Sequence, residues 1–538
     1  MPPTLTYPGI YVEEIPSGVR PIASVSTSNT AFVGFFRLGP MNQPVRITSY
    51  GDFERIFGGL DSRSEASYAI QQYYLNGGQI AFVVRVAGGT PQSAQLNLMT
   101  EGEAPSTALV ISAANPGIWG NALQVAIGSA ADERFNLVVR EVQLVNGRSI
   151  IVANEIFRNL SMNSSDAQFV QAVINDQFAG SQLIHISSVN SEQRPEATSI
   201  EDVTVASIIN DPTNASTDCS TNDTGIFRRL GCDPPMASDG TVPGSEELIA
   251  GMNRLDLIAP EIFNLLCLPA AANLDDENFQ NTYSNATTYC EGKRAFLFID
   301  IPESIDTQAD MTAWMANTGD NLRHENTAVY FPRLAIPDLQ NNGRLRNVPA
   351  SGTLAGLYAR TDTDRGVWKA PAGTEASLRN AQIVTSLTDL ENGALNPFGV
   401  NVLRNFPIYG NVSWGGRTSV GADANPNEWK YIPVRRLALL IEQSLFQGLK
   451  WVVFEPNDEP LWGQIRLNVT DFMNTLFLQG AFQGSSPRQA YLVKCDQETT
   501  TPVDVNNGIV NIVVGFAPLK PAEFVILKLQ QLAAQSAL

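Results

Sequence analysis

The hydrophobic pattern in the first part of the chain alternates between short apolar runs and amphipathic stretches. Ala31–Phe36 (AFVGFF) and Ala81–Val86 (AFVVRV) are continuous apolar runs, which predict buried strands. Between them, Ser49–Phe57 and Ser64–Gly78 predict two helices, because each starts at a potential N-cap serine and the second ends at a glycine pair. The alternation returns later, where we expect helices at 245–257 and 277–292 and strands at Asn264–Pro269, Arg294–Pro302 and Ala328–Leu334. Strands that alternate with helices predict a sheet covered by helices.

Residues 91–244 interrupt this alternation. They are rich in Ser, Thr, Asn and Ala, and their apolar runs are short. Phe135–Phe157 predicts a β-hairpin that turns at Asn146 and Gly147, a dipeptide suited to a type I′ turn. Asn210–Gly225 predicts a polar surface loop. We therefore expect an exposed, mostly-β domain inserted into the α/β unit.

The C-terminal part has the clearest periodicity. Pro433 lies at a plausible helix N1 position, and Val434–Gly448 repeats apolar residues at helical spacing before a terminal glycine. Pro460–Gly480 predicts a second helix, and strands are expected at Lys450–Pro456, Ala490–Cys495 and Gly508–Pro518. In contrast, residues 338–410 contain scattered Gly, Pro and Asn and predict a loop-rich segment.

Two strand-like segments lie close to the ends of the chain. Tyr7–Ile15 (YPGIYVEEI) has breakers on both sides, and Pro521–Ala533 is an extended run with a polar tail. Neither has an evident partner strand next to it in the sequence. Pro16, Gly18 and Pro21 are the breakers that follow the first segment.

These patterns predict a multidomain protein of the α/β and α+β classes. We expect an N-terminal arm at 1–20, a discontinuous βαβ-type middle domain at 21–90 plus 245–350, and the inserted outer domain at 91–244. A C-terminal α/β core at 351–520 and a C-terminal arm at 521–538 complete the division.

The net charge is −19 and is unevenly distributed. Residues 411–538 hold 10 Lys and Arg against 11 Asp and Glu, so the first 410 residues carry −18. An acidic chain argues against direct nucleic-acid binding, since phosphates attract basic surfaces. The split predicts two surfaces that face different surroundings.

Hydrophobic runs and cysteine spacing also indicate where in the cell the protein is made. The longest aliphatic run is Leu437–Ile441, too short to span a bilayer, and the N-terminus lacks the pattern of a signal peptide. We expect a protein made in the cytoplasm without membrane insertion. The five cysteines have no CxxC pair, which predicts free thiols.

A search for chemistry finds no catalytic, cofactor-binding or metal-binding set. His185 and His324 are far apart in the sequence and have no evident carboxylate or thiol partner. Neither GxxxxGK[ST] nor GxGxxG occurs, so the βαβ pattern has no phosphate loop. The acidic Leu274–Asn278 lacks the spacing of a calcium loop and predicts a solvated helix start.

Tryptophan and arginine gather in the C-terminal part. Four of seven tryptophans lie there, and core packing or a subunit interface explains them: Trp414, Trp429, Trp451 and Trp462. Arg435 and Arg436 stand at a helix start, where the macrodipole disfavours cations. Two interpretations stay open for both: a partner carboxylate, within or between chains, or an ordinary surface charge.

Several long motifs, in the same order, resemble contractile tail sheath proteins. At the N-terminal end these are YPGIYVEEIPSGVRPI, TAFVGFF and NGGQIAFVVRV, followed by NPGIWGN (Asn115–Asn121). At the C-terminal end they are VSWGGRT, EWKYIPVRRLALLIEQSLFQGLKWVVFEPND, AYLVKCD and VGFAPLKPAEFVI. The resemblance covers about residues 5–90 and 400–535. Such proteins occur in phages with contractile tails, R-type bacteriocins and extracellular injection systems.

The resemblance implies a C-terminal sheath core with outer domains inserted away from the tube. Subunits would stack as six-fold discs in a helical array around an inner tube, and contraction would drive that tube through a target envelope. The implied partners are further copies, the inner tube protein, and baseplate and tail-terminator or cap proteins. Assembly would take place in the bacterial cytoplasm, giving a phage tail or a phage-tail-like particle.

The resemblance also implies the site residues. Terminal arms would add strands to sheets of neighbouring subunits, through Gly9, Ile10, Tyr11, Val12, Glu13, Glu14 and Ile15 and through Glu523, Phe524, Val525 and Ile526. Arg435, Arg436 and Lys450 would face acidic groups of the inner tube, although local salt bridges explain the arginines almost as well. Two alternatives stay open: a soluble α/β enzyme with an acidic β insertion, and a non-contractile surface-array protein.

Overall fold

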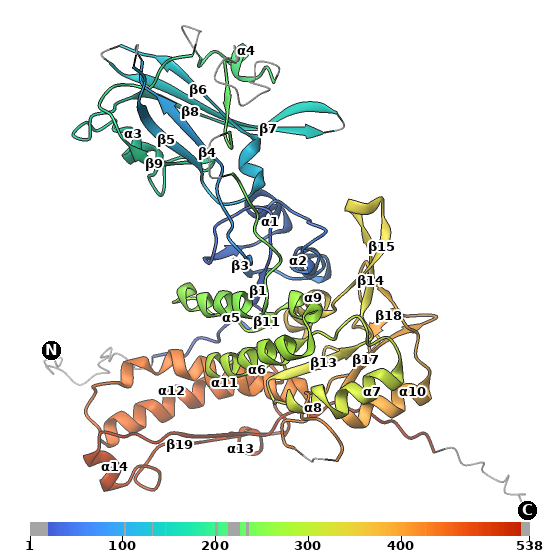
Figure 1. Cartoon of the computed structure of the whole chain (residues 1–538). Helices are drawn as coiled ribbons and strands as arrows, with labels where there is room; N and C mark the ends of the chain where they lie inside the picture. The colour runs from blue at the N-terminus through green and yellow to red at the C-terminus, as the bar shows by residue number, and fades with distance from the viewer. Residues whose placement is uncertain are drawn as a thin grey trace, which may run out of the picture.

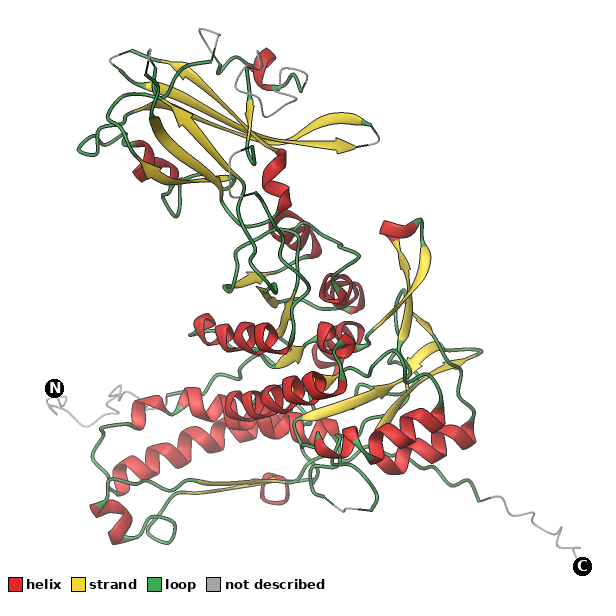
Figure 2. Ribbon diagram, in the orientation of Figure 1, coloured by secondary structure: helices red, strands yellow, loops and turns green. Residues whose placement is uncertain are grey.

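The computed structural model describes residues 20–528, except 102–103, 132, 146, 199–202, 213–225, 233–235 and 425–426. The predicted strand at Gly9–Ile15 and most of the loop at 210–225 lie outside the described residues. The described chain forms three tiers, with a β domain at the top, an α/β region in the middle and a helical base (Figure 1). Figure 2 shows strands dominating the top tier and helices the lower ones.

The middle tier is built on an eight-stranded sheet with the order β18-β17-β13-β12-β11-β1-β3-β2. Its strands are β1 (Thr30–Gly34), β2 (Pro44–Ile47), β3 (Ala81–Arg85), β11 (Leu265–Cys267), β12 (Phe296–Ile299), β13 (Thr327–Phe331), β17 (Val400–Phe406) and β18 (Gly410–Ser413). The six central strands run parallel, and the two edge strands are antiparallel. The expected sheet of the middle domain is confirmed.

Helices cover both faces of this sheet. Alternate strand residues pack on α1 (Tyr50–Phe57), α2 (Glu65–Asn76) and α9 (Ser351–Arg365) on one face. The other residues pack on α5 (Ser245–Asn253), α6 (Asp276–Lys293), α7 (Gln308–Ala316) and α10 (Asp389–Leu395). The predicted caps are present, since the Ser49 and Ser64 hydroxyls accept backbone N–H groups and Gly77 ends α2 in the left-handed conformation. The helices predicted at 49–57, 64–78, 245–257 and 277–292 are confirmed.

The expectation of a loop-rich segment at 338–410 is wrong. This stretch contains α9 and β17, as well as β14 (Leu334–Asp338), β15 (Arg344–Val348) and β16 (Gln382–Ile383), which form a separate three-stranded sheet. The first nine residues of α9 are buried all round, so the helix has no amphipathic period for the sequence to reveal. Gly352 and Gly356 let α9 approach α2 closely, because an added Cβ would lie 2.2 Å and 2.4 Å from the Ala69 and Tyr73 carbonyl oxygens.

This packing also moves the predicted domain boundary at residue 350. Since α9 covers the main sheet and β17 and β18 extend it, residues 351–413 belong to the same layered unit as the middle domain. The C-terminal core begins after this unit.

The insertion is mostly β, as expected. One small sheet contains β4 (Gln95–Met99), β5 (Thr107–Ala113) and β9 (Ile184–Val189), and the other contains β6 (Leu123–Ser129), β7 (Phe135–Val145), β8 (Arg148–Leu160) and β10 (Arg228–Arg229). The predicted hairpin is confirmed, because β7 and β8 pair antiparallel as far as Val145 and Arg148. The short helices α3 (Val170–Ile174) and α4 (Ala206–Ile209) complete this domain. Cys232 is disulfide-bonded, so the expectation of free thiols is wrong for this residue, whereas Cys267, Cys290 and Cys495 are free and buried.

The base of the molecule consists of two long helices and a small sheet. α11 (Ile432–Gly448) and α12 (Glu459–Leu478) share a core with β19 (Tyr491–Lys494) and β20 (Val513–Phe516), and α13 (Pro487–Ala490) and α14 (Pro502–Asn506) flank that sheet. The predicted helices are confirmed, including the buried face of α12 at Ile465, Val469, Phe472, Met473 and Leu476.

The strand predicted at Lys450–Pro456 is wrong. Residues 450–452 form a 3-10 turn, and Val453 and Phe454 point outward. A continuous apolar run predicts burial, but here only Trp451 and Val452 pack on the core of the base, and Val453 and Phe454 are exposed. Within the described residues, no helix combines the length and apolar character needed to cross a bilayer.

Candidate functional site

The two histidines do not form a site. His185 lies exposed on β9 of the outer domain, and His324 precedes β13 of the main sheet. Among the described residues, no group of three or more His, Cys, Asp or Glu side chains is placed to hold a metal ion. His324 Nε2 lies 3.7 Å from a carboxylate oxygen of Glu291, a residue of α6.

Titratable groups do gather at the carboxyl ends of the parallel strands, where α/β enzymes bind ligands. Asp300 follows β12, Cys267 ends β11, and Ser351 begins α9. One carboxylate oxygen of Asp300 accepts the Ser351 N–H at 2.9 Å, which caps the helix. All three side chains are buried, so no substrate reaches them in this structure.

Asp300 should make stability depend on pH. Burial raises the pKa of Asp300 to about 6, against the opposing effect of hydrogen bonds from Ser351. An acid whose folded pKa lies above its unfolded value destabilises the fold as pH rises through the folded pKa. We expect Asp300→Asn to flatten this dependence, so that its stability relative to the unmodified chain improves by about 2 kcal/mol between pH 4 and pH 7.5. Denaturant unfolding at both pH values measures the difference; parallel curves for the two proteins would contradict it.

Arg435 and Arg436 are paired within the chain. Arg435 lies 3.1 Å from Glu325 and 3.3 Å from Glu442, and its Nε donates to Asn326 at 2.6 Å. Arg436 binds both carboxylate oxygens of Asp362, at 2.8 Å and 2.6 Å. Both arginines are buried, so the structure favours the local salt bridges over the tube contact for these two residues. Lys450 is exposed, and its Nζ lies 5.7 Å from the centre of the Phe446 ring.

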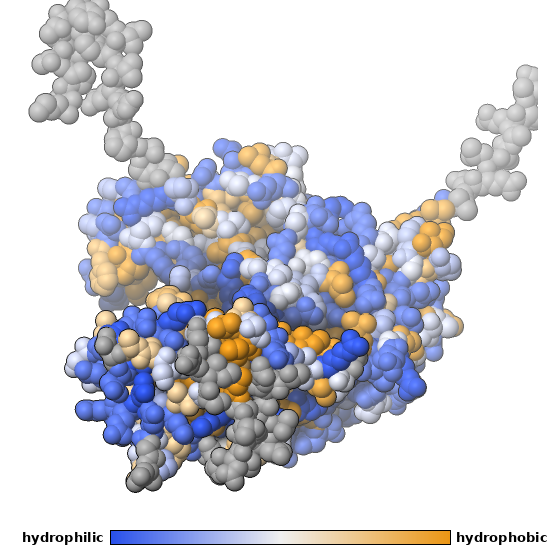
Figure 3. Space-filling view, turned by 90° about the horizontal axis from the view of Figure 1, so that it is seen from above, coloured by the Kyte–Doolittle hydropathy of each residue, from blue (hydrophilic) through white to orange (hydrophobic). Residues whose placement is uncertain are grey.

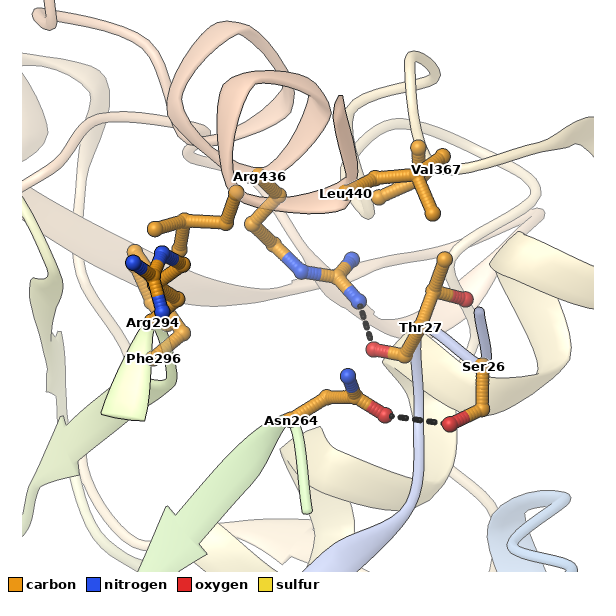
Figure 4. Close-up of a pocket in the computed structure, with 9 residues that line it drawn as sticks. Ser26, Thr27, Asn264, Arg294, Phe296, Val367, Arg436 and Leu440 are labelled. Carbon is orange, nitrogen blue, oxygen red and sulfur yellow. Dashed lines mark hydrogen bonds between the residues drawn. The ribbon is translucent and has the colours of Figure 1, made fainter. Parts of the chain in front are cut away.

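Arg436 also holds the segment that leads to the N-terminal arm. Its second guanidinium nitrogen donates to the Thr27 carbonyl at 3.0 Å, as Figure 4 shows beside the hydrogen bond from Ser26 to Asn264. From there the chain follows α11 toward its C-terminal end. The Val25 N–H donates to the Ser444 hydroxyl at 3.2 Å, and Ile22 packs where a side chain at Gly448 would otherwise be.

The first described residue continues this path. The Arg20 guanidinium lies over the Trp451 ring at 4.6 Å, and the backbone N–H of Arg20 donates to the side-chain oxygen of Asn468, on α12, at 3.1 Å. The base of the predicted N-terminal arm is therefore fixed to α11 and α12 over their length. Trp451 has a partner that sequence reasoning did not foresee, since it lies far from Arg20 along the chain.

The C-terminal segment is anchored by one buried arginine. Arg417 binds Glu523 with two hydrogen bonds, at 2.7 Å from Nε and 2.6 Å from Nη2, and also lies 3.0 Å from Asp423. The pKa of Arg417 is raised because these bonds outweigh its desolvation. Beyond this anchor, Phe524, Val525, Ile526 and Leu527 are 75–83% exposed. Four exposed apolar residues in an extended segment are typical of a strand that lacks its partner.

The small sheet of the base has room for further strands. β19 and β20 pair antiparallel, and within the described chain neither outer edge carries another strand. Backbone N–H and C=O groups at such edges are available for pairing. Figure 1 shows that the two ends of the described chain leave the base on opposite sides. The base therefore carries the two segments that lead to the chain ends and the β19–β20 sheet, whose outer edges are unpaired within the described chain.

The upper surface of the molecule includes the outer domain. Seen from above, the molecule is mostly hydrophilic with scattered apolar residues (Figure 3). This agrees with the excess of negative charge in the first 410 residues.

Comparisons with known proteins show what this chain is similar to. Residues 424–531 match the phage tail sheath C-terminal domain. A tail sheath protein of Vibrio phage KVP40 is 29% identical over 192 residues, which cover 35% of this chain and 27% of the relative. A putative prophage major tail sheath protein of Pseudomonas aeruginosa is 24% identical over 238 residues, covering 43% of this chain and 57% of the relative. The resemblance to contractile tail sheath proteins is confirmed.

Solved structures extend the match to almost the whole chain. The sheath complex of PVC, an extracellular contractile injection system, in its contracted state has a TM-score of 0.56 at 19% identity, covering 98% of both chains. The contracted helical sheath of the anti-feeding prophage has a TM-score of 0.54 at 22% identity, covering 98% of this chain and all of the other. The chain therefore has the sheath fold throughout, although it spans only about a quarter to half of the relatives matched by sequence. The matched proteins are structural sheath proteins rather than enzymes.

Proposed function

We propose that this chain is the structural subunit of a contractile sheath. It polymerises as stacked six-fold discs around an inner tube, and its contraction drives that tube through a target envelope. The observation that carries the proposal is the sheath-domain match at 424–531, together with the exposed segment at Phe524–Leu527 and the open sheet in the same domain.

The terminal arms would join the subunits by strand addition. Phe524–Leu527 supplies unpaired backbone and apolar side chains, and the edges of β19 and β20 in another copy supply matching backbone groups. Gly9–Ile15, which lies outside the described residues, is proposed for the same role on the strength of the sequence. The anchors at Arg417 and Arg436 fix where each arm leaves the domain, so that the body can turn while the strands stay paired.

The energy that moves the inner tube comes from repacking of the subunit array rather than from catalysis. Extended and contracted arrays are two packings of nearly rigid subunits, and the contracted one has more favourable contacts. Small gains per subunit add up along a tube. The sheath would meet an inner tube protein, a baseplate and a terminator or cap at its ends. Lys450, exposed at the base, remains a proposed tube contact, and the acidic outer domain faces solvent in this arrangement.

Deleting residues 1–15 should leave a folded monomer that cannot polymerise. The described core begins at Arg20 and keeps all its contacts, so circular dichroism and the melting temperature should match those of the full chain. Negative-stain microscopy should show ribbed tubes only for the full chain. Normal tubes from the truncated chain would remove the N-terminal segment from the proposal.

A further inference from the structure

The loop between α11 and α12 exposes an apolar knob, formed by Val453 and Phe454. Phe454 is fully exposed and Val453 is 64% exposed, although the sequence predicts burial for both. Phe454 also has φ +71°, a left-handed conformation that bulky residues rarely adopt. Such strain persists where the surrounding structure fixes it, commonly at functional positions. The exposed ring therefore calls for a partner outside the described chain.

The loop is held rigid by its own side chains. Asn457 donates to the Ile509 carbonyl at 3.0 Å and accepts the Trp462 indole N–H at 2.8 Å. Asp458 caps α12 by accepting the Leu461 N–H at 3.2 Å. The knob is thus presented in one fixed orientation, which lowers the entropy cost of binding.

Negative charge surrounds the knob. Glu455, Asp458 and Glu459 follow it directly, and all three are exposed. Glu459 lies 2.7 Å from Arg466, whereas Glu455 forms no ion pair with any residue that the structure describes. A partner surface should therefore combine an apolar socket with positive charge.

One groove of the same chain has these properties. It has a volume of about 1000 Å³ and is bounded on one side by the C-terminal segment Leu519–Phe524. Trp368 and Trp414 line the groove, and so do Lys369, Lys520 and two arginines that are already ion-paired, Arg365 with Glu375 at 2.6 Å and Arg404 with Asp389 at 2.6 Å. Its two acids are already engaged, since Asp389 binds Arg404 at 2.6 Å and Glu523 binds Arg417. Lys520 is exposed and forms no ion pair with the described part of the chain.

The knob and the groove lie on different sides of the molecule. The knob loop is tied to Ile509, just after α14, whereas the groove is lined by residues of α10. Figure 1 shows α14 and α10 at opposite ends of the base. A contact between two different surfaces, repeated from copy to copy, joins the copies head to tail into a ring or a helix.

We propose that the Val453–Phe454 knob of one copy docks into the Trp368–Trp414 groove of the next copy. The Phe454 ring enters between the tryptophans, and Glu455 faces the cations of the groove. This contact rests on the proposed function, because it needs a polymer. It adds a side-chain contact that differs from strand exchange at the arms.

Photocrosslinking in the assembled polymer tests the contact. Phe454 is replaced by p-benzoylphenylalanine in a mixture of ¹⁴N- and ¹⁵N-labelled copies, so that mass spectrometry separates contacts between copies from those within one copy. We expect mixed-isotope crosslinks to residues 365–373, 389–396, 414–416 or 519–524. The matched control replaces Phe178, which is 91% exposed on the outer domain, and should not crosslink to this groove. Crosslinks from position 454 to another surface, or none above background, would overturn the proposal.

A substitution pair gives a second readout. Phe454→Asn removes the ring but keeps a residue that tolerates the left-handed conformation, so the loop and the monomer stability should be retained. We expect the critical concentration for assembly to rise about ten-fold or more, as for a lost hot-spot residue. Phe178→Asn should change it less than about two-fold. Equal assembly of the two variants would overturn the contact alone. Failure of the unmodified chain to assemble would overturn the proposed function and the contact with it.

Discussion

A chain that ends after Glu523 should fold normally and fail to polymerise. The deletion removes Phe524–Leu527, whose side chains are 75–83% exposed and therefore contribute little to folding. The anchor between Arg417 and Glu523 stays in place. We expect the free energy of unfolding to stay within about 0.5 kcal/mol of the full chain. Polymerisation should be lost, because strand addition between subunits depends on backbone and side chains in the deleted segment.

A second truncation serves as the control. A chain that ends after Lys528 keeps the four exposed apolar residues, and it should still form tubes. Sedimentation and negative-stain microscopy of both truncations measure the polymer. Tubes of normal length from the shorter chain would contradict a role for this segment, whereas loss of tubes in both chains would shift that role to residues 529–538.

The sequence predicted elements well where local signals were strong. Ser49, Ser64 and Gly77 mark helix ends by their own chemistry, and each acts at the expected position. It failed at α9 because a helix buried on every side has no hydrophobic period. It failed at Lys450–Pro456 for the opposite reason. Its apolar run is only half covered, since Trp451 and Val452 pack on the core of the base while Val453 and Phe454 are exposed.

The sequence predicted the terminal arms, but it did not predict the side-chain contacts that hold the segments leading to them. Breakers and apolar runs predicted an arm at each end of the chain, and the structure shows Phe524–Leu527 exposed at the C-terminal end. The anchors were missed because they join residues far apart in sequence: Arg417 is 106 positions from Glu523, and Arg436 is 409 positions from Thr27. The unfavourable position of Arg435 and Arg436 at a helix start did signal carboxylate partners, and these proved to be within the chain.

Arg436→Ala should lower the free energy of unfolding by about 3–5 kcal/mol. Arg436 and Asp362 are each 3% exposed and are joined by two hydrogen bonds. Removing the arginine leaves Asp362 as a buried charge without its partner, and it also frees the Thr27 carbonyl and the Tyr358 ring, which lies 4.7 Å from the guanidinium. Denaturant unfolding followed by tryptophan fluorescence reports on this region, because four of the seven tryptophans lie between Trp414 and Trp462.

The double variant Arg436→Met with Asp362→Leu separates the charge effect from the packing effect. Apolar residues of similar volume remove both charges together, so no buried charge is left unpaired, and most of the lost stability should return. The double variant still lacks the hydrogen bond to Thr27, so the segment leading to the N-terminal arm loses one of its attachments to α11. We therefore expect the double variant to fold with near-normal stability but to assemble less efficiently than the full chain. A loss below about 1 kcal/mol for Arg436→Ala would contradict the assignment, because an unpaired buried carboxylate costs more than that.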